Sequence, residues 1–175
     1  MYLGITTQNY SKMKKLLIAL VLPICFACTT ADDGETPIPA MIQGEESSAF
    51  SCINSQADNA PQLDSAKKWI VGKWQLKGII SMVPNPEVPN YQIEFKEDGG
   101  VFITLAGESV FTDAYSLIEE NVNDFRNIKL ITDNLMDIGN ENNIAKGSVR
   151  VCEKELMLDQ GIAFDAPGYL FRKIE

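Results

Sequence analysis

Carboxylates are the side chains of this sequence whose types and spacing come closest to a catalytic pattern, because the 175 residues include no histidine. Glu94, Glu97 and Asp98 are near neighbours that could act as an acid–base pair. However, Glu94 alternates with the apolar Ile93 and Phe95, which puts it on the polar face of a strand, and Asp98 precedes a glycine in a turn. We therefore interpret these carboxylates as solvated surface groups.

The missing imidazole excludes several kinds of catalytic site. A Ser-His-Asp triad, a Cys-His nucleophile pair, a His-ligated zinc and a histidine general base all require it. An oxygen-rich segment at residues 133–142 lacks the spacing of an EF-hand and favours a long polar hairpin loop. Glycine-rich phosphate loops and serine nucleophile elbows are also missing. We expect no enzymatic activity, no metal and no cofactor.

The charge balance argues against nucleic acid as a partner. The chain has 24 acidic and 15 basic side chains and a net charge of −9, whereas a nucleic-acid surface needs clustered Lys and Arg to neutralise phosphates. An apolar content of 45% is sufficient for a core, and the length suits one ordinary domain.

The N-terminal residues have the organisation of an export signal. A basic stretch around Met13 and an apolar run over residues 16–27 precede Cys28. The run is shorter than the roughly 20 residues of a bilayer-spanning helix. Ala27 directly before Cys28 resembles the lipobox of bacterial lipoproteins, in which the cysteine is acylated and becomes the mature N-terminus. Residues 1–27 are thus predicted to be a signal peptide, with a plain secretory signal as the alternative to lipidation.

Cleavage before Cys28 would leave 12 basic and 24 acidic side chains and a net charge of −12. Such a charge disfavours adsorption to anionic lipids, so membrane association would rest on acyl chains on Cys28. The acidic residues that follow Cys28 resemble the surface-export signals of Bacteroidota lipoproteins, with a solvated linker as the alternative. These resemblances imply a cell-envelope protein, namely an outer-membrane lipoprotein that faces the periplasm or the cell surface.

Residues 28–61 are rich in Ser, Asp, Glu, Gln, Asn and Pro, a composition that predicts a flexible tether after the lipidated cysteine. Two cysteines would remain beyond Cys28 in the mature chain, Cys52 and Cys152. An even pair in an oxidising compartment indicates a disulfide, and two unpaired thiols are the alternative. The disulfide would close a loop of about 100 residues and stabilise the fold by up to ~4.7 kcal/mol in the chain-entropy model.

Residues 62–175 are predicted to form one β domain. A short helical turn at residues 64–71 ends at Gly72. Residues 91–96 alternate strictly between apolar and polar, and an Asp-Gly turn joins them to a second strand at residues 101–105. Further strands are predicted at residues 74–83, 110–118, 128–131, 148–152, 155–158 and 169–173. Short strands without intervening helices indicate an antiparallel barrel or sandwich.

The domain resembles the lipocalin-like domains of Bacteroidota lipoproteins. Gly72-Lys73-Trp74 at the head of the first strand is similar to the Gly-x-Trp motif of lipocalins, and the resemblance implies that Arg172 packs over Trp74 as a structural cation–π pair. It further implies an all-β fold, an antiparallel eight-stranded up-and-down barrel that follows a short helical turn.

An eight-stranded barrel is just wide enough to be filled by side chains or to hold one small ligand. The predicted inward positions beside Trp74 are Leu76, Ile80, Tyr91, Ile93, Phe95 and Ile103, and we take these six as candidate ligand-binding residues. Such a ligand would be hydrophobic or amphipathic. The alternative is a non-enzymatic interaction protein with a filled barrel that binds partners through loops such as residues 82–90 or 134–143.

Overall fold

A computed structural model of the chain describes residues 38–56, 60–84, 86–122, 125–133 and 143–175. The predicted signal peptide, Cys28 and most of the oxygen-rich segment at 133–142 lie outside these residues. Within the described ranges, no helix has the length and apolarity that a membrane span would need.

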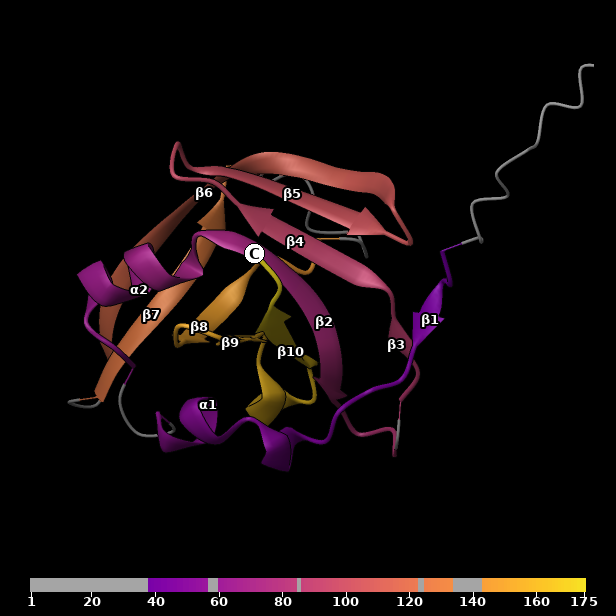
Figure 1. Cartoon of the computed structure of the whole chain (residues 1–175). Helices are drawn as coiled ribbons and strands as arrows, with labels where there is room; N and C mark the ends of the chain where they lie inside the picture. Colours follow the sequence, from indigo (N-terminus) through magenta and orange to yellow (C-terminus); the bar gives the residue numbers. More distant parts are fainter. Residues whose placement is uncertain (1–37, 57–59, 85, 123–124, 134–142) are drawn as a thin grey trace, which may run out of the picture. The chain divides into compact units, whose positions relative to one another are not determined.

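Eight antiparallel strands close into a barrel in the order β10-β2-β4-β5-β6-β7-β8-β9 (Figure 1). Their bounds are β2 Gly72–Ile80, β4 Tyr91–Phe95, β5 Gly100–Leu105, β6 Glu108–Val122, β7 Phe125–Thr132, β8 Gly147–Val151, β9 Glu155–Asp159 and β10 Gly168–Lys173. Neighbours in the barrel follow one another along the chain, and β10 closes it against β2. The predicted up-and-down antiparallel barrel with a short preceding helix is therefore confirmed.

The β4–β5 hairpin forms as its alternating pattern predicts. Phe95 pairs with Val101, and the Asp98 carboxylate accepts a 3.0 Å hydrogen bond from the Gly100 N–H. Strand β6 is longer than expected, because it continues through the polar residues after 118. Diagonal ion pairs join Glu119 to Arg126 and Glu120 to Lys129 across the β6–β7 ladder, so polarity alone does not end the strand.

One end of the barrel is closed by helix α2, Leu63–Ile70, which precedes β2. Ala66 and Ile70 are fully buried in the same core as Trp74, and the Trp74 indole N–H donates a 2.7 Å hydrogen bond to the Ile70 carbonyl. The cation beside this indole is Lys173, whose Nζ lies 5.1 Å from the Trp74 ring centroid. The implied Arg172–Trp74 pair is wrong, since Lys173 is the residue of β10 that pairs with Trp74.

The segment from Met41 to Gln56, here called the strap, packs on the outside of the barrel. It contains strand β1 (Met41–Ile42), which pairs with β3 (Val88–Pro89), the 3₁₀ turn η1 (Ser47–Ala49) and helix α1 (Ser51–Ser55) (Figure 1). Phe50 and Ile53 have no exposed surface and pack against Met157 and Leu170. The predicted flexible tether over residues 28–61 is therefore wrong for the strap. Two of the strap's apolar side chains pack against apolar residues of the barrel wall and hold it there.

The disulfide between Cys52 and Cys152 is present and joins α1 to the residue that follows β8. Its predicted pairing is confirmed. The bond holds the strap covalently to the barrel over a sequence separation of 100 residues.

A β-bulge in β2 decides which side chains enter the barrel. Leu170 pairs with Gly78 and Phe171 with Leu76, so Lys77 has no partner on β10 and shifts the alternation by one residue. Beyond the bulge, Ile79 packs against the barrel core, whereas Ile80 packs with the strap residues on the outer face. The predicted inward position of Ile80 is therefore wrong.

Candidate functional site

The barrel interior contains five of the six candidate ligand-binding residues. Leu76, Ile93 and Ile103 have no exposed surface, and Phe95 is 1% exposed; all four pack in one core with Trp74. At the α2 end these side chains therefore contact one another closely and form the packed centre of the fold.

Partly buried side chains lie at the other end of the interior. Four partly buried side chains pack against the core here, namely Ile79, Tyr91, Val110 and Tyr169. Burial raises the pKa of the Tyr169 hydroxyl, and the neighbouring Tyr91 raises it further. Ile79 is the penultimate residue of β2 and pairs with Tyr169, the second residue of β10, so both lie at the end of the barrel opposite the start of β2, here called the loop end.

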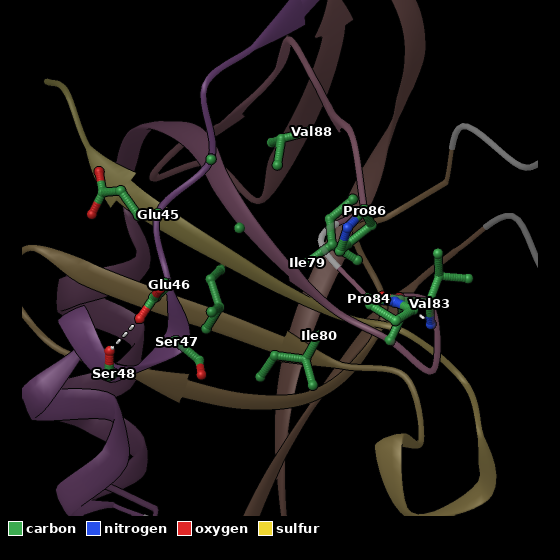
Figure 2. Close-up of a pocket in the computed structure, with 14 residues that line it drawn as sticks. Glu45, Glu46, Ser47, Ser48, Ile79, Ile80, Val83, Pro84, Pro86 and Val88 are labelled. Carbon is green, nitrogen blue, oxygen red and sulfur yellow. Dashed lines mark hydrogen bonds between the residues drawn. The ribbon is translucent and has the colours of Figure 1, made fainter.

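A pocket of about 530 Å³ lies on the barrel wall at this loop end, between the strap and the residues after β2. Figure 2 shows Glu45, Glu46, Ser47 and Ser48 along one side, Val83, Pro84 and Pro86 along the other, and Ile80 between them. The remaining lining residues are Gly44, Gly78, Ile79, Ser81, Val88 and Leu170. We call this feature the wall pocket; its volume is in the range typical of small-molecule sites.

Close approach of the strap to β2 builds this pocket. The Glu45 N–H donates to the Lys77 carbonyl at the bulge. A Cβ atom at Gly78 would lie 2.8 Å from the Glu45 carbonyl oxygen, so only glycine permits this distance between the strap and the strand. Ile80 is the one candidate ligand-binding residue that lines the wall pocket, and the bulge turns its side chain there.

Arg172 holds the strap in place from the outer face of β10. Its Nη1 donates to Glu155 Oε1 at 2.8 Å and its Nε to Glu45 Oε2 at 3.1 Å, while its guanidinium carbon lies 4.2 Å from the Phe50 ring centroid. The second Glu155 oxygen accepts the backbone N–H groups of Cys52 and Ile53. Alternation along β10 could have indicated this role, since Arg172 and Lys173 must point to opposite faces.

The wall pocket has an acidic polar side. Glu45 and Glu46 both line it, and none of its lining residues is basic. Glu46 accepts a 3.3 Å hydrogen bond from the Ser48 hydroxyl and forms no ion pair within the described ranges. In those same ranges, no group of three His, Cys, Asp or Glu side chains is arranged to hold a metal ion.

Large apolar side chains are exposed in the loops at the same end. Met82 is 78% and Val83 63% exposed after β2, and Phe164 is 88% exposed in the 3₁₀ turn η3, Ile162–Phe164. One loop follows Ile80 at the end of β2, and the other precedes Gly168 at the start of β10. The two loops meet the sheet at neighbouring positions, because Ile80 pairs with Gly168. Exposed apolar side chains mark a binding surface where they form one contiguous patch.

Comparison with known proteins does not assign the chain to a family. No family model, no curated protein and no solved structure matches it. The fold itself is an eight-stranded antiparallel barrel, compatible with a lipocalin-like fold.

Proposed function

We propose that this protein is a lipid-anchored lipoprotein of the cell envelope, and that its barrel domain binds a small amphipathic ligand. The observation that carries the binding proposal is the wall pocket, in which carboxylate and hydroxyl groups of the strap face apolar side chains of the loop after β2. The anchor rests on the sequence around Cys28, which resembles a lipobox.

The two sides of the wall pocket suit two parts of one ligand. Ile80, Val83 and Leu170 offer apolar surface to a hydrocarbon or aromatic body, which gains free energy when it leaves water. Ser47 and Ser48 offer hydroxyl groups that can donate or accept hydrogen bonds at a polar head. In this arrangement the barrel core is the rigid support of the site, and the ligand lies on the wall.

Titration with octyl glucoside below its critical micelle concentration tests the binding proposal. The protein is the full chain with Cys28→Ala, which prevents acylation and keeps detergent micelles out of the sample. We expect a saturable site and a several-fold loss of affinity in Val83→Asp, because a carboxylate replaces apolar contact surface. The matched control is Ile118→Asp, which changes an exposed residue of β6 outside the pocket. Equal affinity in both variants would contradict the proposal.

A second function is favoured by the exposure of Met82, Val83 and Phe164. These side chains would contact a protein partner in the envelope, with the barrel as scaffold. A photo-crosslinking residue at position 82 would then capture one defined protein on intact cells, and the same residue at the exposed position 118 would not. Equal crosslinking patterns at the two positions would count against this function.

A further inference from the structure

We infer that the ligand of the wall pocket carries a cationic head group, and that Glu46 is the residue that recognises it. This inference rests on the proposed function and specifies the chemical class of the ligand, a small organic cation with an alkyl or aromatic body.

The charges around the pocket do not balance. Among the residues that the structure describes, Arg172 is the cationic side chain in an ion pair with the strap, and it is shared between Glu45 and Glu155. One guanidinium between two carboxylates leaves a net charge of −1, and Glu46 adds a second negative charge without an ion pair in the described part of the chain. A region of this kind attracts cations and repels carboxylate or sulfate amphiphiles.

Glu46 is the carboxylate that is free to contact a ligand. Glu45 is only partly exposed and its Oε2 already accepts from Arg172 at 3.1 Å, whereas Glu46 is exposed and contacts the Ser48 hydroxyl. Figure 2 shows Glu46 and Ser48 hydrogen-bonded to each other on the strap side of the pocket, across from the loop with Val83. An ammonium group beside Glu46 would neutralise one of these two negative charges.

The apolar surface opposite limits the size and nature of the cation. Pro84 and Pro86 have rigid rings without a backbone donor, and Val83 and Ile80 extend the same apolar side. A bare metal ion would gain nothing from these groups. An alkylammonium or arylammonium ion places its charge at the strap and its body against the loop, so both sides of the pocket are used.

Three probes with alkyl tails of seven or eight carbons separate the head-group preference from the binding of the tail. Octyltrimethylammonium, octyl glucoside and octanoate are titrated below their critical micelle concentrations into the full chain with Cys28→Ala, by calorimetry. We expect the ammonium probe to bind most tightly and octanoate most weakly. Raising the salt concentration should reduce the difference between the ammonium probe and the glucoside, because salt screens exposed charges.

The decisive variant is Glu46→Gln. It should weaken the ammonium probe about two- to fivefold, the effect expected of an exposed ion pair, and leave octyl glucoside unchanged. The matched control is Glu97→Gln, which removes the same charge from the exposed β4–β5 turn beside the start of β2, at the α2 end. Backbone amide signals of Glu46 and Ile80 should shift in nuclear magnetic resonance spectra when the ammonium probe is added.

The possible results distinguish the inference from the proposed function. If the ammonium probe and the glucoside bind equally, or if the Gln variants at positions 46 and 97 behave alike, the cationic preference is wrong while small-ligand binding stands. If none of the three probes binds, the binding function and the inference both fail. A loss specific to Glu46→Gln and to the ammonium probe supports both.

Discussion

Arg172 on β10 and Glu155 on β9 form an ion pair with an Nη1–Oε1 distance of 2.8 Å, and both side chains of this pair also bind the strap. The same Glu155 carboxylate accepts the N–H groups of Cys52 and Ile53, and the same guanidinium donates to the Ala49 carbonyl. Because the strap forms one side of the wall pocket, the pair is coupled to the candidate site as well as to stability.

Substitution of Glu155 by Gln should destabilise the protein. The side chain is 10% exposed, and the change removes the charge that two backbone donors and Arg172 share. We expect a loss of about 1–3 kcal/mol in the free energy of unfolding, the range for hydrogen bonds to charged groups. Urea unfolding of the variant and the unchanged protein measures this loss. The control Glu119→Gln removes a more exposed pair with Arg126 at 3.5 Å and should cost less than about 1 kcal/mol. Equal costs would contradict the role assigned to Glu155.

Reduction of the Cys52–Cys152 disulfide should loosen the strap before it unfolds the barrel. The bond closes a loop with a sequence separation of 100 residues, so its loss costs up to ~4.7 kcal/mol in the chain-entropy model. Hydrogen exchange should then rise in the strap more than in β4 and β5, and binding at the wall pocket should weaken. The double variant Cys52→Ser with Cys152→Ser should reproduce both effects. Uniform exchange across the whole domain would show that the strap does not loosen separately.

Lys173 is expected to support the closed end of the barrel. Its ammonium donates to the Trp69 carbonyl at 3.0 Å and the Val71 carbonyl at 2.6 Å, at the C-terminal end of α2, beside the Trp74 ring. Lys173→Met leaves these carbonyls without their donor, so we expect a loss of about 1–2 kcal/mol and a change in tryptophan fluorescence. The comparison variant Lys73→Met removes an exposed pair with Glu175 and should leave the fluorescence unchanged.

Stability should fall at alkaline pH in part because of Tyr169. Burial raises the pKa of its hydroxyl above the ordinary value of about 10 in the folded state. Its contribution is complete below the unfolded pKa and is lost as the pH rises through the folded pKa, because the unfolded chain then releases the proton more readily. Tyr169→Phe should flatten the fall of stability above about pH 10, measured by urea unfolding at several pH values. An unchanged slope would contradict this assignment.

Cys28→Ala tests the anchor on its own. We expect the variant to leave the membrane fraction and to lose labelling by a fatty-acid analogue, since no other anchor is proposed for the chain. Retention of the variant in washed membranes would show that the lipobox interpretation is wrong. The result is independent of ligand binding, because Cys28 lies outside the described domain.

Much of the barrel could be predicted because its determinants are local. The alternation at residues 91–96 and the Asp-Gly turn specify a hairpin without reference to the rest of the chain, and the structure contains it in register. The candidate site was less predictable. Only Ile80 among the candidate ligand-binding residues lines the wall pocket, because the bulge at Lys77 reverses the faces of β2 and no local pattern indicates it.

The amino-acid sequence by itself determined the acidic charge, most of the barrel strands, the antiparallel all-β class and the two cysteines that could pair. Only the tertiary structure decided that the strap is packed, that Lys173 and not Arg172 lies beside Trp74, and that the described pocket is on the wall. The physical reason is the sequence separation between the residues that interact. Strand alternation follows from neighbouring residues, whereas Phe50, Glu155 and Arg172 meet across about a hundred residues and gain stability only once the barrel is closed.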